Sequence, residues 1–214
     1  LDFGTGWGRI CRVFLHDIEP HGILGVDPLP FMVDACRQTF EGSGVSFQAI
    51  DPLAPTSLPA ESFDLITAYS VFSHLNQSVS TAWMAEFLRL LRPGGIVVAT
   101  THDVDLLQFC RKLRAEGADE SADFLWHRLL ARAFGDLDDA ERRYWAGEFV
   151  HAPHGGGDAL DSSYYGDSMF DLSFVQRSWA HLLEPVAFEH ANGPSGLPQS
   201  AFALRKRVQV VAAP

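Results

Sequence analysis

The sequence has few cysteines, no long apolar run and no leader-like start. Cys11, Cys36 and Cys110 are isolated thiols without C-x-x-C spacing, which argues against a disulfide framework or a zinc site and favours a reducing cytoplasm. No apolar run approaches the ~18 to 20 residues that a membrane-spanning helix needs, and no signal-peptide pattern opens the chain. We therefore expect a cytoplasmic protein without membrane contact.

Basic residues are also scarce. The chain has 16 Lys and Arg against 27 Asp and Glu, and the net charge of -11 opposes binding to phosphate backbones. Nucleic acid is therefore not expected as a substrate or partner. The excess of acidic side chains is unevenly distributed along the chain, because residues 103–167 hold 14 acidic and 7 basic side chains, a net charge of -7.

The size and composition predict one domain with a full core, since the chain has 214 residues of which 47% are hydrophobic. Its first residue is Leu1, and an expected strand is already under way there. We therefore treat residues 1–214 as a single domain that is incomplete at its N-terminus.

The first ten residues carry glycines at alternate positions between a strand end and a helical pattern. Gly4, Gly6 and Gly8 would let a ligand approach the backbone, and the following helix N-terminus would attract an anionic group. The dinucleotide fingerprint G-x-G-x-x-G requires a third glycine where this chain has Arg9. This disfavours a nicotinamide-dependent oxidoreductase, which is kept as an alternative.

A carboxylate follows the next expected strand. Asp27 ends the apolar stretch 22–27 and lies 19 residues beyond Gly8. About 20 residues commonly separate a glycine loop from the acid that binds ribose hydroxyls. Asp27 is therefore a candidate ribose ligand, and the alternative is a solvated acid at a strand end.

Three stretches occur in an informative order. Asp2-Phe3-Gly4-x-Gly6-x-Gly8 is followed by the segment Phe63 to Leu75 and then by Leu91-Arg92-Pro93-Gly94-Gly95 before an apolar strand. Over residues 1 to about 102 this order resembles the class I S-adenosylmethionine-dependent methyltransferases. The resemblance implies S-adenosylmethionine as cofactor and a doubly wound, Rossmann-like α/β fold. That fold has a mostly parallel seven-stranded sheet, an antiparallel terminal strand pair and, here, a helical insertion after strand five.

The resemblance also implies a cofactor site. The glycine loop would bind the methionine part of the cofactor, and Asp27 would bind the ribose. Pro28 and Asp51 would lie around the adenine, although an aspartate before a proline, as in Asp51-Pro52, is also common in turns. Tyr69 and Ser70 would border the methyl group. The complete set of expected cofactor-binding residues is Asp2, Phe3, Gly4, Thr5, Gly6, Gly8, Asp27, Pro28, Asp51, Pro52, Tyr69 and Ser70.

Apolar periodicity predicts the remaining elements. Helices are expected over 7–18, 28–40, 79–91, 103–115, 122–134 and 172–183, with another starting at 138, and strands over 45–50, 63–68, 96–101, 185–190 and 200–211. The stripe in 79–91, which includes Trp83, is interpreted as core packing. No strand is expected in 103–165, which we interpret as an acidic helical lid over the substrate. A solvated appendage or a homodimer contact is the alternative.

Two histidines follow expected strand ends, where this type of sheet binds ligands. Histidine suits proton removal near neutral pH, so His74 or His102, but not both, is expected to act as the base, and Tyr69 is a further catalytic candidate. His151 and His154 are separated by Ala-Pro and followed by glycines, which suggests a mobile loop, and no metal site is expected.

The segment Phe63 to Leu75 departs from two nucleic-acid patterns of this family. It has neither the Asn/Asp-Pro-Pro-Tyr of many enzymes that methylate amines of DNA bases nor the Pro-Cys of cytosine C5 methylation. We therefore expect in-line methyl transfer to a small molecule, with oxygen as the favoured acceptor atom. The alternative is a methyltransferase-like binding or regulatory module without turnover.

Overall fold

The computed structural model describes residues 1–118, 123–193, 196 and 198–208. Two expected boundaries therefore lie outside the described residues. These are the start of the helix predicted from Ala122 and the end of the strand predicted to run to Val211.

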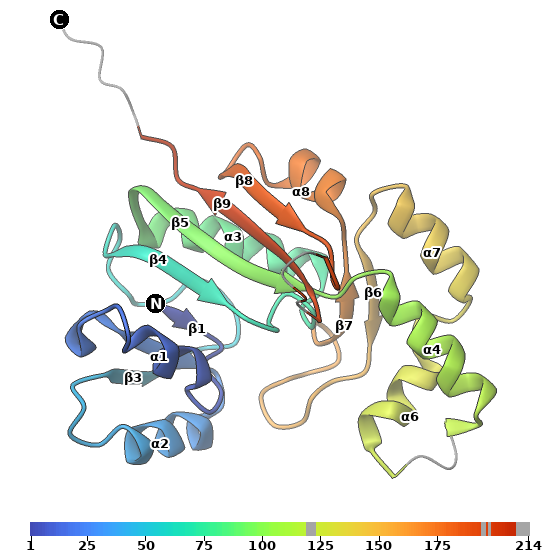
Figure 1. The fold of residues 1–214 in the computed structure, drawn as a ribbon, viewed down its shortest axis with the longest axis horizontal. Coiled ribbons are helices and arrows are strands. Elements are labelled where there is room, and N and C mark those ends of the chain that lie inside the picture. Colours follow the sequence, from blue (N-terminus) through green and yellow to red (C-terminus); the bar gives the residue numbers. More distant parts are fainter. Residues whose placement is uncertain (119–122, 194–195, 197, 209–214) are drawn as a thin grey trace, which may run out of the picture.

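A seven-stranded sheet organises the fold, in the order β3-β2-β1-β4-β5-β9-β8 (Figure 1). The first five strands pair in parallel, whereas β9 runs antiparallel to β5, and β8 runs antiparallel to β9. This confirms the predicted fold class. The strands are β1 (Asp2–Phe3), β2 (Leu24–Asp27), β3 (Ser46–Ala49), β4 (Phe63–Ala68), β5 (Leu91–Thr101), β8 (Glu184–Glu189) and β9 (Ser200–Arg205).

The helices lie where the periodicity predicts them but are mostly shorter. They are α1 (Arg9–Phe14), α2 (Pro30–Thr39), α3 (Gln77–Leu90), α4 (Asp105–Ala115), α6 (Leu125–Arg132), α7 (Leu137–Trp145) and α8 (Leu172–Ser178). A short 3-10 turn covers Pro20–Gly22. Helix α1 begins only after Gly8, because Gly8 has a left-handed backbone with φ of 74°. None of the helices in the described ranges is long and apolar enough to cross a membrane.

The insertion after β5 contains a hairpin that the sequence analysis did not predict. The expectation of no strand in 103–165 was wrong, because β6 (Val150–Pro153) pairs antiparallel with β7 (Gly166–Met169). Strand β7 lacks apolar alternation, since its sequence is Gly-Asp-Ser-Met, yet all four residues are buried. Gly166 is needed for the close pairing, because a Cβ there would lie 2.1 Å from the Ala152 carbonyl oxygen.

The hairpin stands between the sheet and the helices α4, α6 and α7 (Figure 1). Those helices have their own apolar cluster with the hairpin, which includes Leu107, Leu130, Tyr144 and Val150. The helical part of the insertion is therefore a packed layer of its own.

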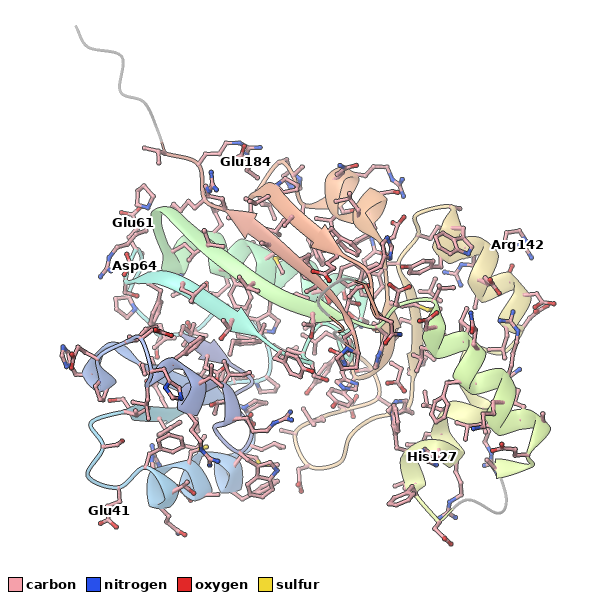
Figure 2. The ribbon with its side chains drawn as sticks, in the orientation of Figure 1. Glu41, Glu61, Asp64, His127, Arg142 and Glu184 are labelled. Atoms are coloured by element: carbon pink, nitrogen blue, oxygen red, sulfur yellow. The ribbon has the colours of Figure 1, made fainter. Side chains whose placement is uncertain are left out.

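The three cysteines are free and buried, and charged side chains such as Asp64 and Arg142 lie at the periphery (Figure 2).

Aromatic rings fill the main core between α3, the sheet and α8. Phe202 on β9 lies 5.5 Å from Phe170 and 5.9 Å from both Phe72 and Trp179, measured between ring centroids. All four side chains are fully buried. These rings join the antiparallel edge of the sheet to the segments that carry the site residues.

Replacing Phe202 with alanine should remove this contact. We expect Phe202→Ala to lower the free energy of unfolding by about 3 to 5 kcal/mol, because a buried ring leaves a cavity that the core fills only in part. Urea denaturation measures the change. Phe31→Ala is the matched control, since Phe31 is 50% exposed and should change stability by less than about 0.5 kcal/mol. Equal losses in the two variants would contradict this account of the core.

Candidate active site

The glycine loop between β1 and α1 is tied to β2 through its backbone. The N-H groups of Gly4 and Thr5 donate to the carbonyl of Val26 at 2.9 and 3.0 Å. Gly4 has φ of 71°, and a Cβ there would lie 2.4 Å from the Val71 side chain. Gly6 also has a positive φ, of 50°, but no atom would lie within 4 Å of a Cβ there. The loop thus combines one closely packed glycine with one that faces open space.

Asp27 joins the end of β2 to this loop. Its Oδ2 atom accepts a hydrogen bond from the Gly6 N-H at 2.9 Å, and its Oδ1 atom accepts one from the Leu29 N-H at 3.0 Å. The side chain is 6% exposed. Burial raises the pKa of Asp27, and the hydrogen bonds from Leu29 and Gly6 partly oppose that shift. Each carboxylate oxygen keeps a lone pair for a ligand hydroxyl.

Asp2 lies beneath the loop, away from the pocket. Its carboxylate accepts hydrogen bonds from Thr5 Oγ1 at 2.8 Å, from Thr67 Oγ1 at 3.1 Å and from Cys11 Sγ at 3.3 Å. It thereby fastens the loop to β4 and α1. Gly8 is also structural, because a Cβ there would lie 2.6 Å from the Phe40 ring.

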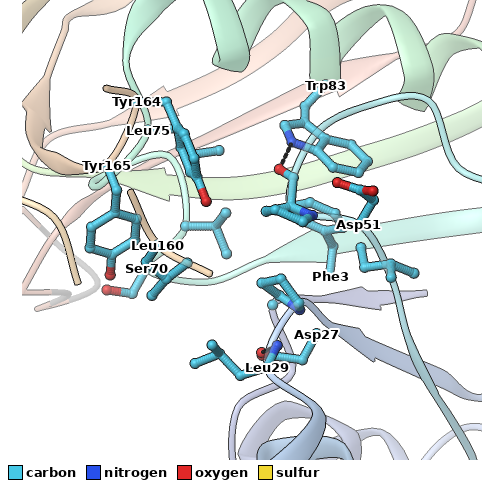
Figure 3. A pocket seen from close by; sticks show the side chains of 15 residues that line it. Phe3, Asp27, Leu29, Asp51, Ser70, Leu75, Trp83, Leu160, Tyr164 and Tyr165 are labelled. Carbon is cyan, nitrogen blue, oxygen red and sulfur yellow. Dashed lines mark hydrogen bonds between the residues drawn. The ribbon is translucent and has the colours of Figure 1, made fainter. Parts of the chain in front are cut away.

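A pocket opens beside Asp27 at the carboxyl ends of the parallel strands (Figure 3). Of the predicted cofactor-binding residues, the structure brings these to its lining: Phe3, Gly4, Asp27, Pro28, Asp51, Pro52 and Ser70. It does not bring Asp2, Thr5, Gly6, Gly8 or Tyr69 there. The ring of Tyr69 instead lies under the guanidinium of Arg9, 5.8 Å away. The cofactor roles of all these residues stay predictions.

Eight further residues line the pocket that were not predicted from the sequence. They come from neighbouring loops, α3 and the insertion: Leu29, Ile50, Val71, Leu75, Trp83, Leu160, Tyr164 and Tyr165. Trp83 was interpreted as core packing, and it is buried, but it also forms part of the pocket wall. Its indole N-H donates to the Pro52 carbonyl at 3.3 Å and so holds the loop after β3 (Figure 3).

Tyr164 and Tyr165 reach the pocket from the loop between β6 and β7. Their signal in the sequence was a tyrosine pair soon after three glycines, in a segment interpreted only as part of a lid. The Tyr165 carbonyl accepts hydrogen bonds from the N-H groups of His154 and Gly155, at 3.2 and 3.0 Å. The loop therefore closes on itself with its tyrosines toward the pocket.

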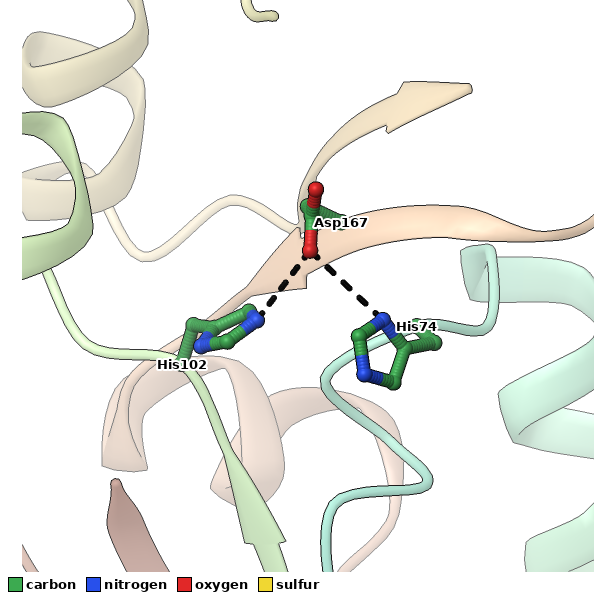
Figure 4. A group of neighbouring side chains, drawn as sticks. All are labelled: His74, His102 and Asp167. Carbon is green, nitrogen blue, oxygen red and sulfur yellow. Dashed lines mark hydrogen bonds and ion pairs between the residues drawn. The ribbon is translucent and has the colours of Figure 1, made fainter. Parts of the chain in front are cut away.

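A cluster of histidines surrounds Asp167 beyond this wall (Figure 4). The Asp167 Oδ1 atom lies 3.2 Å from His102 Nε2 and 3.5 Å from His74 Nδ1, and Oδ2 lies 2.8 Å from His154 Nε2. The Asp167 side chain has no exposed surface. The structure thus brings the two predicted histidines together and adds Asp167 and His154, which the sequence analysis had not assigned to the site.

The partners of His74 fix which ring nitrogen carries a proton. Its Nδ1 atom lies 2.9 Å from the Gly166 carbonyl oxygen, which can only accept a hydrogen bond. Nδ1 is therefore the protonated nitrogen of the neutral ring, and Nε2 keeps the lone pair. The ring stacks on Tyr165 with centroids 5.1 Å apart and an angle of 13° between the planes. His74 thus stacks on a pocket residue and keeps Nε2 as its proton-accepting nitrogen.

The same cluster has the composition of a metal site. Atoms of His74, His102 and Asp167 that could bind a metal lie within 4.8 Å of one another. The His74 nitrogen in that group is, however, the one that donates to Gly166. We therefore interpret these contacts as a hydrogen-bonded network.

The chain is similar to known methyltransferases over most of its length. A family model described as a methyltransferase domain matches residues 1–95. An uncharacterized methyltransferase of Geobacillus kaustophilus is 31% identical over 180 residues, which cover 83% of this chain and 71% of that protein. The chain belongs to the class I S-adenosylmethionine-dependent methyltransferases. Its cofactor is S-adenosylmethionine.

Solved structures share the fold of this methyltransferase at low sequence identity. The PH0226 protein of Pyrococcus horikoshii is 16% identical with a TM-score of 0.60, over 96% of this chain and 80% of that one. An S-adenosylmethionine-dependent methyltransferase of Mesorhizobium loti is 14% identical with a TM-score of 0.59, over 95% of this chain and 89% of that one.

The residues present fit this cofactor. Gly4 lines the pocket without a side chain, so a ligand can approach the backbone there, and Asp27 offers a buried carboxylate for ribose hydroxyls. The wall made by Ile50, Pro52 and Trp83 is apolar, as a flat adenine ring requires. We therefore expect the methyltransferase to hold S-adenosylmethionine in the pocket of Figure 3.

Removing the Asp27 carboxylate should weaken cofactor binding. We expect Asp27→Ala to raise the Kd for S-adenosylhomocysteine by about 10- to 100-fold, because hydrogen bonds to a charged group each contribute about 1.5 to 3 kcal/mol. Isothermal titration calorimetry measures the change. Asp34→Ala is the control, since Asp34 makes only an exposed ion pair with Arg37 on α2. Unchanged affinity in Asp27→Ala would refute the assignment.

Proposed function

We propose that this methyltransferase methylates a hydroxyl oxygen of a small molecule and that His74 accepts the proton of that hydroxyl. The observation that carries the proposal is the arrangement of His74, whose Nδ1 proton is held by Gly166 while its ring stacks on the pocket residue Tyr165. An alcohol must lose a proton to become a good methyl acceptor, and a positioned imidazole provides that step.

His74 is a better candidate than His102 for the base. The His74 side chain is 20% exposed, and the next residue, Leu75, lines the pocket. The His102 side chain is 11% exposed, and burial lowers its pKa despite its contact with Asp167. His102 contacts the His74 ring edge-on, with centroids 5.6 Å apart, and its Nε2 atom lies 3.2 Å from the Asp167 oxygen that also faces His74 (Figure 4). We therefore assign proton transfer to His74 and an orienting role to His102.

The reaction needs little covalent participation from the chain. S-adenosylmethionine, when bound, supplies an electrophilic methyl group on its sulfonium. The chain would align the hydroxyl with that methyl group and take up the released proton at His74 Nε2. Ser70 lines the pocket, and its Oγ is 3.4 Å from the Oγ of Ser73, the residue before His74. Gln199 Nε2 donates to the same Ser70 Oγ at 3.0 Å. These polar groups suit a hydroxylated acceptor.

The loop between β6 and β7 would form the outer wall of the acceptor site. Leu160, Tyr164 and Tyr165 supply its side chains to the pocket, whereas α4, α6 and α7 pack in their own cluster. We therefore restrict the lid proposed for 103–165 to this loop. The net charge of -11 disfavours nucleic acid as acceptor. The wall formed by one leucine and two tyrosines favours a small organic acceptor.

A direct test is a screen of small hydroxylated compounds with methyl-labelled S-adenosylmethionine. Mass spectrometry detects the methylated product, and the carbon chemical shift of the transferred methyl group distinguishes oxygen from nitrogen or carbon as its new partner. We expect an O-methyl product. A product methylated only on nitrogen or carbon would contradict the proposed acceptor atom.

Substitution of the base should slow turnover without loss of the cofactor. We expect His74→Gln to lower kcat by about 10²- to 10⁴-fold, because general base catalysis contributes that much, while S-adenosylhomocysteine binds as in the wild type. His181→Gln is the matched control on an exposed histidine. If His74→Gln turns over at the control rate while His102→Gln does not, the base is His102.

A further inference from the structure

His154 differs from the other histidines in this cluster, because both of its ring nitrogens face hydrogen-bond acceptors. Nδ1 lies 2.7 Å from the Gly155 carbonyl oxygen, and Nε2 lies 2.8 Å from Asp167 Oδ2. A carbonyl accepts only, so Nδ1 must carry a proton. A carboxylate also accepts only, so Nε2 must carry one as well. A ring with both nitrogens protonated is an imidazolium.

The proton could in principle lie on Asp167 instead, but the other contacts of that carboxylate argue against it. Oδ1 lies 3.2 Å from His102 Nε2, so a second ring N-H group points at a carboxylate without exposed surface, and His74 Nδ1, which donates to the Gly166 carbonyl, lies 3.5 Å away. Donors on both oxygens of one carboxylate favour its ionised form. The pair of His154 and Asp167 is therefore a buried ion pair.

The expected protonation equilibria agree with this assignment. Burial alone would raise the pKa of Asp167, but the hydrogen bonds from His102, His154 and His74 outweigh it and lower that pKa. The hydrogen bond to Asp167 raises the pKa of His154 above its ordinary value of 6.5, against an opposing effect of burial. Both directions place the proton on His154.

We propose that His154 is a positioning residue, an imidazolium whose ion pair with Asp167 keeps His74 neutral and holds it in the orientation that presents Nε2 to the acceptor. This inference rests on the proposed role of His74 as the base. The positive charge on His154 offsets the negative charge of Asp167, which would otherwise favour protonation of His74. Asp167 can then orient two imidazoles without raising the proton affinity of the base.

The consequence for substitution has a definite sign. In His154→Gln the amide can still donate to Asp167, but the positive charge is gone. Asp167 would then favour the protonated form of His74. A base must be unprotonated to act, so the acid limb of the rate profile should move toward higher pH.

The titratable groups that contact or interact with this pair come from several elements. They are His74 after β4, His102 after β5, Cys110 on α4, His151 on β6 and Tyr165 before β7. His151 is the matched control, because it lies on the same hairpin but contacts Ser168 Oγ, at 2.7 Å, and not Asp167. Burial lowers the pKa of His151, so it carries no comparable charge.

Nitrogen-resolved NMR of the histidine rings tests the inference without any acceptor. We use the full chain with S-adenosylhomocysteine, labelled with ¹⁵N in its histidines, and follow each ring between pH 5 and 9, a window of about two units on either side of neutrality. His154 should show two protonated ring nitrogens at neutral pH, whereas His74 should show one, on Nδ1. A neutral His154 ring at pH 7 would overturn the inference.

The variants then test the coupling. The acid limb of the rate profile should move toward higher pH in His154→Gln and keep its wild-type position in His151→Gln. Equal acid limbs in wild type and His154→Gln would show that His154 does not act on His74. If His154→Gln does not fold, the ring signals of the wild type still show whether His154 is an imidazolium. If added Zn²⁺ abolishes the ring N-H signals that face Asp167, the cluster is a metal site and the inference is overturned.

This readout separates the two proposals. If His154 is an imidazolium and His74→Gln nevertheless keeps full turnover, the ion pair exists but the proposed base is wrong. If His74→Gln loses turnover and His154 is neutral, the base stands and the positioning role fails. A shifted acid limb in His154→Gln, with unchanged rate at high pH, supports positioning over a general loss of structure.

Discussion

The buried carboxylate of Asp167 is the constraint on which the functional end of the molecule depends. A charge without exposed surface is stable only when donors surround it, and here the donors come from three separate segments. His74 follows β4, His102 follows β5 and His154 follows β6, so one carboxylate ties the inserted hairpin to the sheet. The insertion is therefore joined to the catalytic end of the methyltransferase by polar contacts as well as by packing.

The pocket expected to hold the cofactor depends on the glycine loop, in which backbone groups make the contacts. Gly4 lies too close to Val71 to carry a Cβ, and Gly6 directs its N-H to Asp27. Asp27 then connects the loop to the end of β2, while Trp83 holds the loop after β3 through the Pro52 carbonyl. Contacts within the chain thus fix three connections of the parallel sheet around one pocket. Preorganisation of this kind lowers the entropic cost of binding.

Local patterns predicted the first half of the chain well, because there the chemistry and the fold share the same short motifs. The glycine loop, Asp27 and the Leu91 to Gly95 stretch lie where a doubly wound sheet requires them, and the parallel strand order followed. The hairpin β6–β7 could not be predicted in this way. Its strand β7 buries Asp167 and Ser168, and a polar residue is buried only when partners distant in sequence satisfy it.

The sequence by itself determined the class of protein, the cofactor and the class of fold, since these depend on spacings within a few tens of residues. It also named His74 and His102, which follow strand ends. Only the tertiary structure decided that both rings share one carboxylate, because a contact over 65 residues, as between His102 and Asp167, arises from the crossing of the chain and not from its local pattern. It also decided that His154, 13 residues before Asp167, faces the same carboxylate. Hydrogen-bond partners fix protonation states, so the proposed acid-base chemistry is a property of the fold.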